Sequence, residues 1–294
     1  MALKFSLQLF LFFASIAPHV IMARVLHTDI SSNLQESRIG NNIVGIQDVK
    51  LYLQRYGYLT NVESTNPNVF DDLLEFAIKI FQKYHSLNVS GILDKETLTL
   101  MSQPRCEVPD ILHNNNITQS AIQINSTNFH SHFTFFPGNP KWPISKYHLT
   151  YTFLDNFPNN FIAPVTNAME QWGMFSKFTF SAAARSQTAD ITFNFVRGNH
   201  GDGYPFEGKG GALAHAFGPP DGRVHFDADE SWVDGSVSGS FNVGMVVLHE
   251  LGHVLGLGHS TTRDAIMWPY MNAGDQTRGL QFDDIQGIQT LYSS

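Results

Sequence analysis

The sequence predicts an α+β fold, in which a small all-helical domain precedes a larger domain of strands and helices. Apolar residues recur at helical spacing between residues 43 and 101. Residues 111–132 are rich in Asn, Ser, Thr and His and have little periodicity, which is typical of an exposed linker. Beyond residue 135, strand-like and helix-like segments alternate, so we expect a domain that combines a sheet with helices.

Three helices are expected in the first domain. Residues 43–57 carry Ile46, Val49 and Leu53 at the spacing of an amphipathic helix, and Gly57 marks its end. Residues 70–84 predict a second helix with acidic residues near its start. A third, short helix is expected after Asp94, because an aspartate at this position can cap a helix N-terminus.

The second domain shows both strand and helix patterns. Strands are predicted at residues 147–153, 178–180 and 191–196, and helices at residues 162–175, 241–252 and 282–291. Residues 198–225 are rich in glycine and carry several histidines, a composition that favours an ion-binding loop over regular structure. The chain therefore holds two domains of different character.

Composition narrows the class of protein. Of the 294 residues, 43% are hydrophobic and 15% are charged, which is enough apolar material for a core and unlike a disordered chain. The formal net charge of -8 argues against a nucleic-acid-binding protein, which would present a basic face.

The N-terminus has the pattern of a secretory signal peptide over residues 1–23. Lys4 precedes the apolar stretch 5–17, and Ala23 offers a small residue for cleavage. The alternative is an uncleaved membrane anchor, but the run is short for a span and Pro18 interrupts it. No later stretch predicts a membrane span, so we expect a secreted protein of the extracellular space, apoplast or cell wall.

Sequons and cysteine usage fit the secretory pathway. N-glycosylation sequons begin at Asn88, Asn116 and Asn125, all before residue 130. Cys106 is the single cysteine of the sequence, so it cannot form an internal disulfide. By itself it is a dimer link, a buried passenger or a functional thiolate.

The segment 249–259 carries the strongest chemical signal. His249 and His253 are four residues apart, so on a helix they share a face and can bind one metal ion. Glu250 can then take a proton from a water molecule activated by that ion. Gly256 permits a left-handed turn that ends the helix and brings His259 round as a third ligand.

Three imidazoles leave one position of a tetrahedral zinc ion open, which is typical of a catalytic site. An ordinary amphipathic helix with surface histidines would explain a bare pair of histidines. It does not explain why three His, one Glu and one Gly all stand at the required spacing.

With Ser260 after the third histidine and Met267 further on, this segment resembles the metzincin proteases and, within them, the matrixins or matrix metalloproteinases. The resemblance implies a metzincin-like catalytic domain at 135–294, with a twisted mixed sheet and three helices. It also implies a helical propeptide at 24–110, a linker and activation region at 111–134, and Met267 as the Met-turn residue. The short build is most similar to the plant matrixins lacking a hemopexin domain.

The same resemblance implies further ion sites. Four residues match the structural-zinc pattern of matrixins: His200, Asp202, His215 and His225. Three carboxylates resemble the calcium ligands of the family: Glu207, Asp227 and Glu230, with Glu207 where the family usually has Asp. A second calcium would involve Asp190, although Arg223 replaces the Asp that partners it in the family.

Residues 104–110 resemble the matrixin cysteine switch, in which the thiolate of Cys106 fills the open zinc position and the propeptide inhibits its own enzyme. Arg105 would pair with Asp110 in the family manner. Glu107 stands where the family usually has Gly, and we expect its side chain to lie near Glu250 and to weaken latency.

We therefore expect a monomeric zinc endopeptidase made as a zymogen, in which Glu250 is the general base and protein substrates are cut. An edge strand at 211–214 would pair with the substrate backbone through Leu213 and Ala214. The S1' wall would comprise Pro269, Tyr270 and Met271, and we expect a bulky apolar P1' residue.

Other functions are open from the sequence. A zinc-binding module that recognises peptides without cutting them is one, although Glu250 speaks against it. A membrane-held sheddase requires residues 5–23 to stay attached. Among enzymes, an astacin- or reprolysin-type specificity is the alternative, and Ser260 disfavours it.

Overall fold

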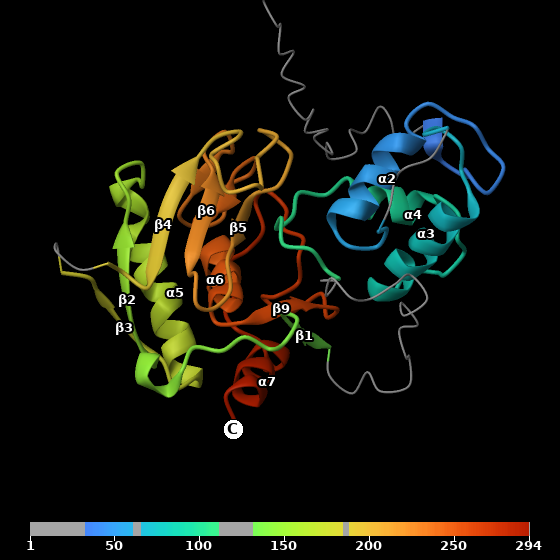
Figure 1. Cartoon of the computed structure of the whole chain (residues 1–294). Coiled ribbons are helices and arrows are strands. Elements are labelled where there is room, and N and C mark those ends of the chain that lie inside the picture. The colour runs from blue at the N-terminus through green and yellow to red at the C-terminus, as the bar shows by residue number, and fades with distance from the viewer. Residues whose placement is uncertain (1–32, 61–65, 112–131, 185–187, 294) are drawn as a thin grey trace, which may run out of the picture.

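The computed structural model describes residues 33–60, 66–111, 132–184 and 188–293. The predicted signal peptide, Asn116, Asn125 and most of the predicted linker lie outside these residues. The described chain forms a helical unit, residues 33–111, and an α+β unit, residues 132–293 (Figure 1). Within these residues, no helix has the length and apolar character needed to cross a membrane.

The helical unit contains α2 (Ile46–Arg55), α3 (Asp72–Tyr84) and α4 (Lys95–Met101), which confirms the three predicted helices. Helix α2 starts three residues later than predicted because Gly45, with φ 104°, precedes it in a left-handed conformation. Asp71 and Asp94 cap the other two helices by accepting hydrogen bonds from backbone amides three residues on.

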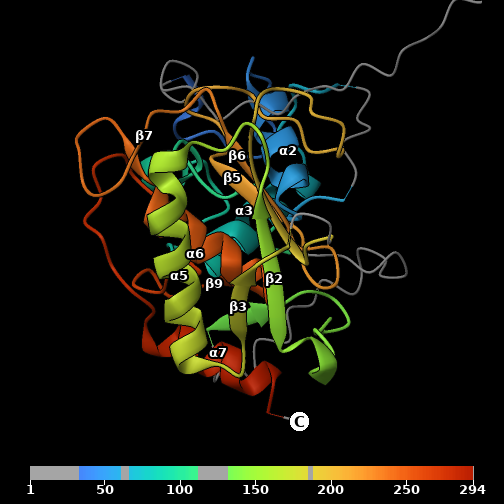
Figure 2. The same ribbon diagram turned by 90° about the vertical axis from the view of Figure 1, so that its left-hand side faces the viewer.

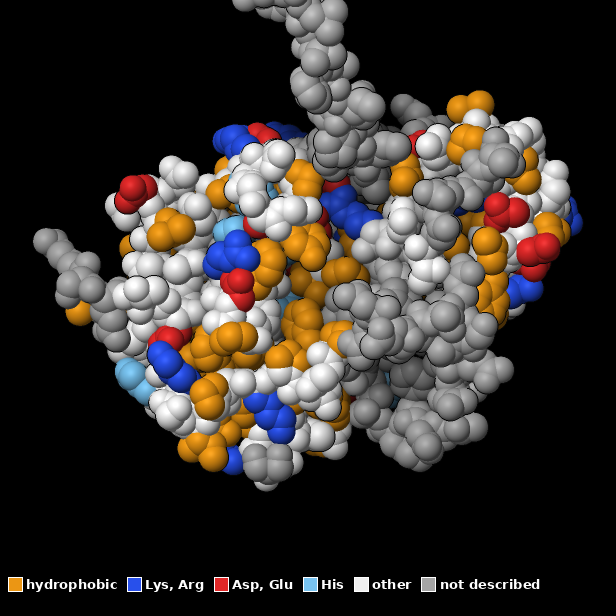
Figure 3. All heavy atoms as spheres, viewed as in Figure 1, with side chains coloured by type: hydrophobic (Ala, Val, Ile, Leu, Met, Phe, Trp, Pro, Cys, Tyr) orange, Lys and Arg blue, Asp and Glu red, His pale blue; other side chains and the backbone are white. Residues whose placement is uncertain are grey.

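The core of the helical unit extends into the α+β unit. Its helices bury apolar side chains such as Val49, Leu74 and Phe81 against one another. Trp268 and Tyr270, from the α+β unit, belong to the same buried cluster. The two units are therefore joined by a shared apolar contact, and in Figure 3 hydrophobic side chains of the α+β unit gather beside its boundary with the helical unit.

A five-stranded mixed sheet forms the frame of the α+β unit, in the order β3-β2-β4-β6-β5. Its strands are β2 (His148–Phe153), β3 (Thr179–Ala182), β4 (Ile191–Val196), β5 (Ala214–Ala216) and β6 (Arg223–Asp227). All neighbouring pairs are parallel except β5 with β6, so β5 is an antiparallel edge strand. This arrangement confirms the mixed sheet implied by the resemblance.

The stretch 198–225, which its composition predicts to be a loop, contains β5 and the first residues of β6, so that part of the prediction is wrong. The edge strand expected at 211–214 is found at 214–216, as β5. Both strands are short, and they present histidines and buried residues on successive positions instead of an alternating apolar pattern. Two small pairs complete the unit. They are β1 (Phe133–Phe135) with β9 (Leu257–Ser260), and β7 (Trp232–Val233) with β8 (Phe241–Asn242).

The α+β unit has the three expected helices: α5 (Ile162–Phe175), α6 (Val243–Val254) and α7 (Phe282–Leu291). Helices α5 and α6 pack on the five-stranded sheet, whereas α7 packs against β1 and β9. Two 3-10 turns, η2 (Ile144–Lys146) and η3 (Asn159–Phe161), flank β2 and α5. Helices α5 and α6 run beside each other against the sheet (Figure 2), and the Trp172 indole donates to the Leu248 carbonyl across them at 2.8 Å. This hydrogen bond fixes the position of α6 relative to α5.

Gly252 on α6 lets the helix approach the segment that contains Met267. A Cβ added at Gly252 would stand 2.2 Å from Met267 Sδ and 3.1 Å from the Trp172 ring, and all three residues are buried. We expect Gly252→Ala to lower the free energy of unfolding by about 1–3 kcal/mol through overpacking. Chemical denaturation of the full chain measures this change. Gly138→Ala is not a suitable control, although Gly138 is exposed, because its φ is positive. Unchanged stability would contradict the close packing.

Candidate active site

Helix α6 carries two of the predicted metal ligands. Asn242 caps its start, and every residue of the helix except Gly244 is buried. His249 and His253 lie one turn apart, with their Nε2 atoms 3.1 Å from each other. Burial holds the pKa of both imidazoles well below the ordinary value, so the rings are neutral and able to bind a metal.

The third histidine reaches the same place through a turn. Helix α6 ends at Val254, and Gly256 follows with φ 100°. A Cβ at Gly256 would lie 2.6 Å from the Pro140 carbonyl oxygen, so both the backbone conformation and the space require glycine. Strand β9 then carries His259 back toward α6, as the spacing predicted.

Each of the three rings donates from Nδ1 to a nearby oxygen, which turns its Nε2 toward the common centre. The pairs are His249 with the Ile266 carbonyl at 2.7 Å, His253 with the Leu257 carbonyl at 2.8 Å, and His259 with the Asp110 carboxylate at 2.7 Å. The Nε2 atom of His259 is buried and has no hydrogen-bond partner among the described residues. An orphaned buried acceptor of this kind fits a metal ion.

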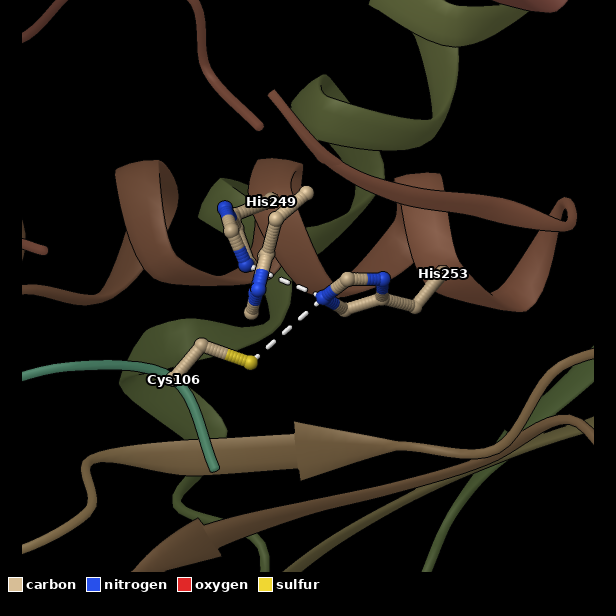
Figure 4. Close-up of side chains that lie close together, drawn as sticks. Cys106, His249 and His253 are labelled. Atoms are coloured by element: carbon tan, nitrogen blue, oxygen red, sulfur yellow. Dashed lines mark hydrogen bonds between the residues drawn. The ribbon is translucent and has the colours of Figure 1, made fainter. Parts of the chain in front are cut away.

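Cys106 adds a fourth donor. Its Sγ lies 3.4 Å from His253 Nε2, and Figure 4 shows the thiol pointing at that ring, with His249 beside it. The ligand atoms of the cysteine and the three histidines all lie within 4.8 Å of one another. Burial and the charge of Glu250 raise the pKa of the Cys106 thiol well above its usual value, whereas a bound zinc cation would favour the thiolate.

Glu250 lies beside this centre with no partner of its own. It is fully buried, and neither carboxylate oxygen has a hydrogen-bond partner in the described part of the chain. Burial raises the pKa of Glu250 to about 8, against a lowering effect of the neighbouring Cys106 thiol. A buried carboxyl without a structural partner, next to a metal-binding cluster, is suited to proton transfer.

Met267 packs against Gly252 of α6, and its backbone is held by a residue that the sequence did not indicate as functional. Asp284, the third residue of α7, accepts hydrogen bonds from the amides of Ile266 and Met267 at 2.9 and 3.0 Å. No specific signal in the sequence indicates this role, because an acidic residue in the first turn is common in helices.

The second predicted cluster is also brought together. Oδ2 of Asp202 lies 2.8 Å from His200 Nε2, His215 Nε2 and His225 Nδ1. His215 and His225 face each other across β5 and β6, while the other two residues come from the preceding loop. All four ligand atoms lie within 4.8 Å of one another, and this donor set fits a closed tetrahedral zinc site.

The predicted calcium ligands are placed near this cluster. Asp227 Oδ2 is buried and has no hydrogen-bond partner among the described residues, and burial raises the pKa of this carboxyl to about 6. Glu230 accepts a hydrogen bond from the Gly210 amide at 2.5 Å. Glu207 instead forms an ion pair with Arg55 of the helical unit. The orphaned oxygen of Asp227 fits a cation, while Glu207 already has a counter-charge in this state.

Asp190, the ligand expected for a second calcium, has protein partners on both oxygens. Lys146 forms an ion pair with Oδ1, and the Thr150 amide and hydroxyl donate to Oδ2 at 2.9 and 2.8 Å. Arg223 forms an ion pair with Asp221 at 2.7 Å.

Residues 104–110, called here the switch loop, extend from the helical unit into the α+β unit. The loop lies between the end of β5 and residues 269–271 and is held by four backbone hydrogen bonds. They are Leu213 N to Arg105 O (2.9 Å), Glu107 N to Ala214 O (2.9 Å), Cys106 N to Pro269 O (2.9 Å) and Met271 N to Pro104 O (3.1 Å). The residues predicted to bind substrate therefore hold the switch loop in this structure.

The side chain of Tyr270 points away from the predicted substrate cleft, unlike the backbone groups of Pro269 and Met271 that contact the switch loop. Its hydroxyl lies 3.0 Å from the Tyr52 hydroxyl and accepts from the Arg105 guanidinium at 3.2 Å, so the side chain faces the helical unit. Beside the switch loop there is a cavity of about 110 Å³, lined by Val108, Pro109, Phe136, Tyr204, His215 and Phe217, among others.

Arg105 and Asp110 form a buried ion pair with N–O distances of 2.6 and 3.0 Å. The Arg105 guanidinium lies 3.6 Å above the centre of the Tyr56 ring. Asp110 also accepts from the Tyr58 hydroxyl at 2.6 Å, in addition to His259. Sequence reasoning named the pair but missed Tyr56 and Tyr58, because these contacts depend on the tertiary packing of the helical unit. It also missed His259, because that contact depends on how the two units dock.

Glu107 lies near enough to Glu250 for its charge to help raise the pKa of Glu250, as expected, but its direct partners are other residues. Its carboxylate contacts His215 and Arg55, at 2.7 and 2.5 Å, and Glu250 is not among its hydrogen-bond partners. It is almost fully buried. Neither partner was predicted, since no local pattern links a helix in the first unit to a strand in the second.

The fold and the site together define a zinc-type metalloendopeptidase, with two histidines and a glutamate on one buried helix and a third histidine after a glycine turn. The family model described as Matrixin matches residues 141–293, and the chain belongs to the matrixin family. A model for peptidoglycan-binding domains matches residues 44–101, within the helical unit.

Individual relatives agree with this family. Metalloendoproteinase 2-MMP of Arabidopsis thaliana is 37% identical over 284 residues, which cover 90% of this chain and 75% of the relative. Metalloendoproteinase 1 of Glycine max is 41% identical, with 86% and 83% covered. Human Matrilysin is 38% identical, with 82% and 83% covered. The chain is accordingly a metalloendopeptidase, similar to both plant and animal members.

Proposed function

We propose that this matrixin is a secreted zinc endopeptidase made as a latent zymogen, whose helical unit is its own inhibitor. The observation that carries the proposal is the meeting of Cys106 with His249, His253 and His259, because one unit supplies the thiol and the other the imidazoles. A thiolate in the fourth zinc position leaves no room for water.

A zinc ion held by the three histidines supplies a Lewis acid that polarises a peptide carbonyl and increases the acidity of water. Glu250, at the edge of the same centre, then takes a proton from the attacking water and delivers it to the leaving amine. The rings of the histidines are held in place by their Nδ1 hydrogen bonds.

The substrate backbone takes the place of the switch loop. Leu213 N and Ala214 O, which bond to the loop in the latent form, become available to an extended peptide at the edge of the sheet. Pro269 and Met271 border the same cleft on its other side. Because Met271 is flexible and apolar, it supports a preference for a bulky apolar P1' residue.

The remaining ions have structural roles in this proposal. His200, Asp202, His215 and His225 would hold a second zinc with no open position, and Asp227, Glu230 and Glu207 would hold calcium. Asp190 is the remaining candidate for a second calcium.

Secretion is supported by the N-terminal pattern and by Asn88, which is exposed. We propose domains at 1–23 (signal peptide), 24–110 (propeptide), 111–134 (activation region) and 135–294 (catalytic), and a monomer that cuts extracellular proteins. N-terminal sequencing of secreted material separates a cleaved signal from an anchor, because a start near Arg24 rules out the anchor.

The proposed activity can be tested by metal removal. Full-length protein, cut within 111–134 by an added protease, is expected to cleave a quenched peptide with Leu at P1'. A zinc chelator should reduce the rate to that of the no-enzyme control, and added zinc should restore it. Uncut protein is the control for latency. An intact peptide after complete cutting, with zinc measured in the protein, would rule out the peptidase.

A further inference from the structure

Glu107 connects the helical unit to the second metal cluster. Its Oε2 accepts a hydrogen bond from His215 Nδ1 at 2.7 Å, and its Oε1 accepts one from Arg55 at 2.5 Å. Glu107 is 3% exposed and His215 is 3% exposed. Arg55 ends helix α2 and also pairs with Glu207 of the α+β unit. A continuous chain of charged contacts therefore runs from α2 through the switch loop to β5.

The His215 ring explains why a carboxylate at this position matters. His215 directs Nε2 into the cluster of Asp202 and His225, which leaves Nδ1–H as a donor on the opposite side. A carboxylate that accepts this hydrogen bond fixes the ring and makes the imidazole a better metal ligand. In this chain that carboxylate comes from the switch loop, and Arg55 compensates its negative charge.

Asp110 makes the matching contact at the first cluster, where it accepts from His259 Nδ1 at 2.7 Å. The switch loop thus places one carboxylate behind a histidine of each cluster. Both carboxylates have an arginine of the helical unit as counter-ion, Arg105 for Asp110 and Arg55 for Glu107. Removing one member of such a buried pair leaves an unpaired charge, which is strongly unfavourable.

We propose that in the latent form Glu107 orients His215, a ligand of the structural zinc site, through its hydrogen bond to Nδ1. We further propose that Glu107 and Arg55 form a second latch, through His215 and Glu207, that holds the propeptide on the α+β unit independently of the thiol. This proposal rests on the proposed function. Two consequences follow: capping Cys106 alone leaves the switch loop attached, and the structural zinc is lost more slowly from the latent chain than from the mature one. Under this proposal Glu107 strengthens latency, which is the opposite of the expectation from the sequence.

The test compares wild-type zymogen with Glu107→Gly, Glu107→Gln and Arg55→Met, all zinc-loaded and full length. Glu96→Gln is the matched control, because Glu96 is an exposed carboxylate on the same unit. One measurement is the rate at which a metallochromic chelator takes up the second zinc equivalent. The other is the rate at which peptidase activity appears after a thiol-capping reagent is added without protease.

For Glu107→Gly we expect roughly tenfold faster loss of one zinc equivalent, as for other residues that accept a hydrogen bond from a metal-bound histidine. Activity after thiol capping should also appear faster by on the order of tenfold. Glu107→Gln and Arg55→Met should each increase the two rates by a smaller factor. The variant that combines these two substitutions should show less than the product of their separate factors, because the two residues are in contact. Glu96→Gln should match the wild type.

Wild-type rates of both zinc loss and activation in Glu107→Gly would overturn the proposal. If that variant does not fold, the isosteric Glu107→Gln decides by the same criterion. Complete proteolytic activation removes residue 107, so all variants should then reach one peptidase rate. If the activated chain never cleaves peptide, the proposed function is wrong. The comparison of zinc-loss rates would still test whether Glu107 and Arg55 form a latch.

Discussion

Glu250→Gln is expected to lose peptide-bond cleavage and to keep its zinc. Glutamine has nearly the same size but cannot accept a proton from water, so the loss in kcat/KM should be on the order of 10²–10⁴-fold. The histidines keep their own hydrogen bonds to Ile266 and Leu257, and these do not involve Glu250. The measurement is kcat/KM on a quenched peptide after complete proteolytic activation, together with zinc content.

Glu170→Gln provides the control for Glu250→Gln, since Glu170 is an exposed carboxylate on α5. It should leave both rate and zinc content unchanged. If Glu250→Gln keeps full activity, Glu250 is not the general base. If it loses zinc along with activity, the substitution has disturbed the metal site and says nothing for proton transfer.

Asp110→Asn is expected to destabilise the latent form by about 3–5 kcal/mol, the usual result of breaking a buried ion pair on one side. Asp110 accepts hydrogen bonds from Arg105, Tyr58 and His259, all of them buried. An amide keeps the volume but leaves the Arg105 charge without a partner. Thermal unfolding of the zymogen measures the loss, and peptidase activity without added protease measures the escape from latency.

The pH dependence gives a further check on Asp110→Asn. Although burial opposes ionisation, Arg105 and the hydrogen bonds from His259 and His85 hold the pKa of Asp110 well below its usual range. A carboxyl with a lowered pKa stabilises the fold above its unfolded pKa and loses this effect as the pH falls through the folded value. The difference between wild type and variant should therefore be full at pH 7 and shrink in strong acid. A difference that grows on acidification would contradict the assignment.

The sequence predicted those helices and site residues that are determined by residues close to each other in the chain. Helices α2, α3 and α5 follow from apolar periodicity and caps, such as Asp71 on α3. Spacing alone indicated that His249, His253 and His259 could share an ion, because helix geometry and Gly256 fix it locally. The residue pattern did not predict β5 or β6, because their histidines replace the alternating apolar pattern on which strand prediction relies. Only the resemblance implied an edge strand near β5, at 211–214.

The contacts between the two units could not be read from the sequence. Asp110 lies 149 residues from His259, and Glu107 lies 108 residues from His215. Both contacts depend on docking of the switch loop between β5 and residues 269–271. The resemblance to matrixins placed Cys106 at the zinc, but family usage has Gly at the position of Glu107 and so offered no partner for it.

The switch loop binds the cleft through four backbone hydrogen bonds and several buried side chains, and it is covalently joined to its own target. While the connection through residues 112–131 is intact, the inhibitor is held at an effective concentration that does not fall when the protein is diluted. One cut in that segment turns a unimolecular equilibrium into a bimolecular one. At the dilution of a secreted protein, the same contacts then favour dissociation, so activation should become irreversible by dilution alone.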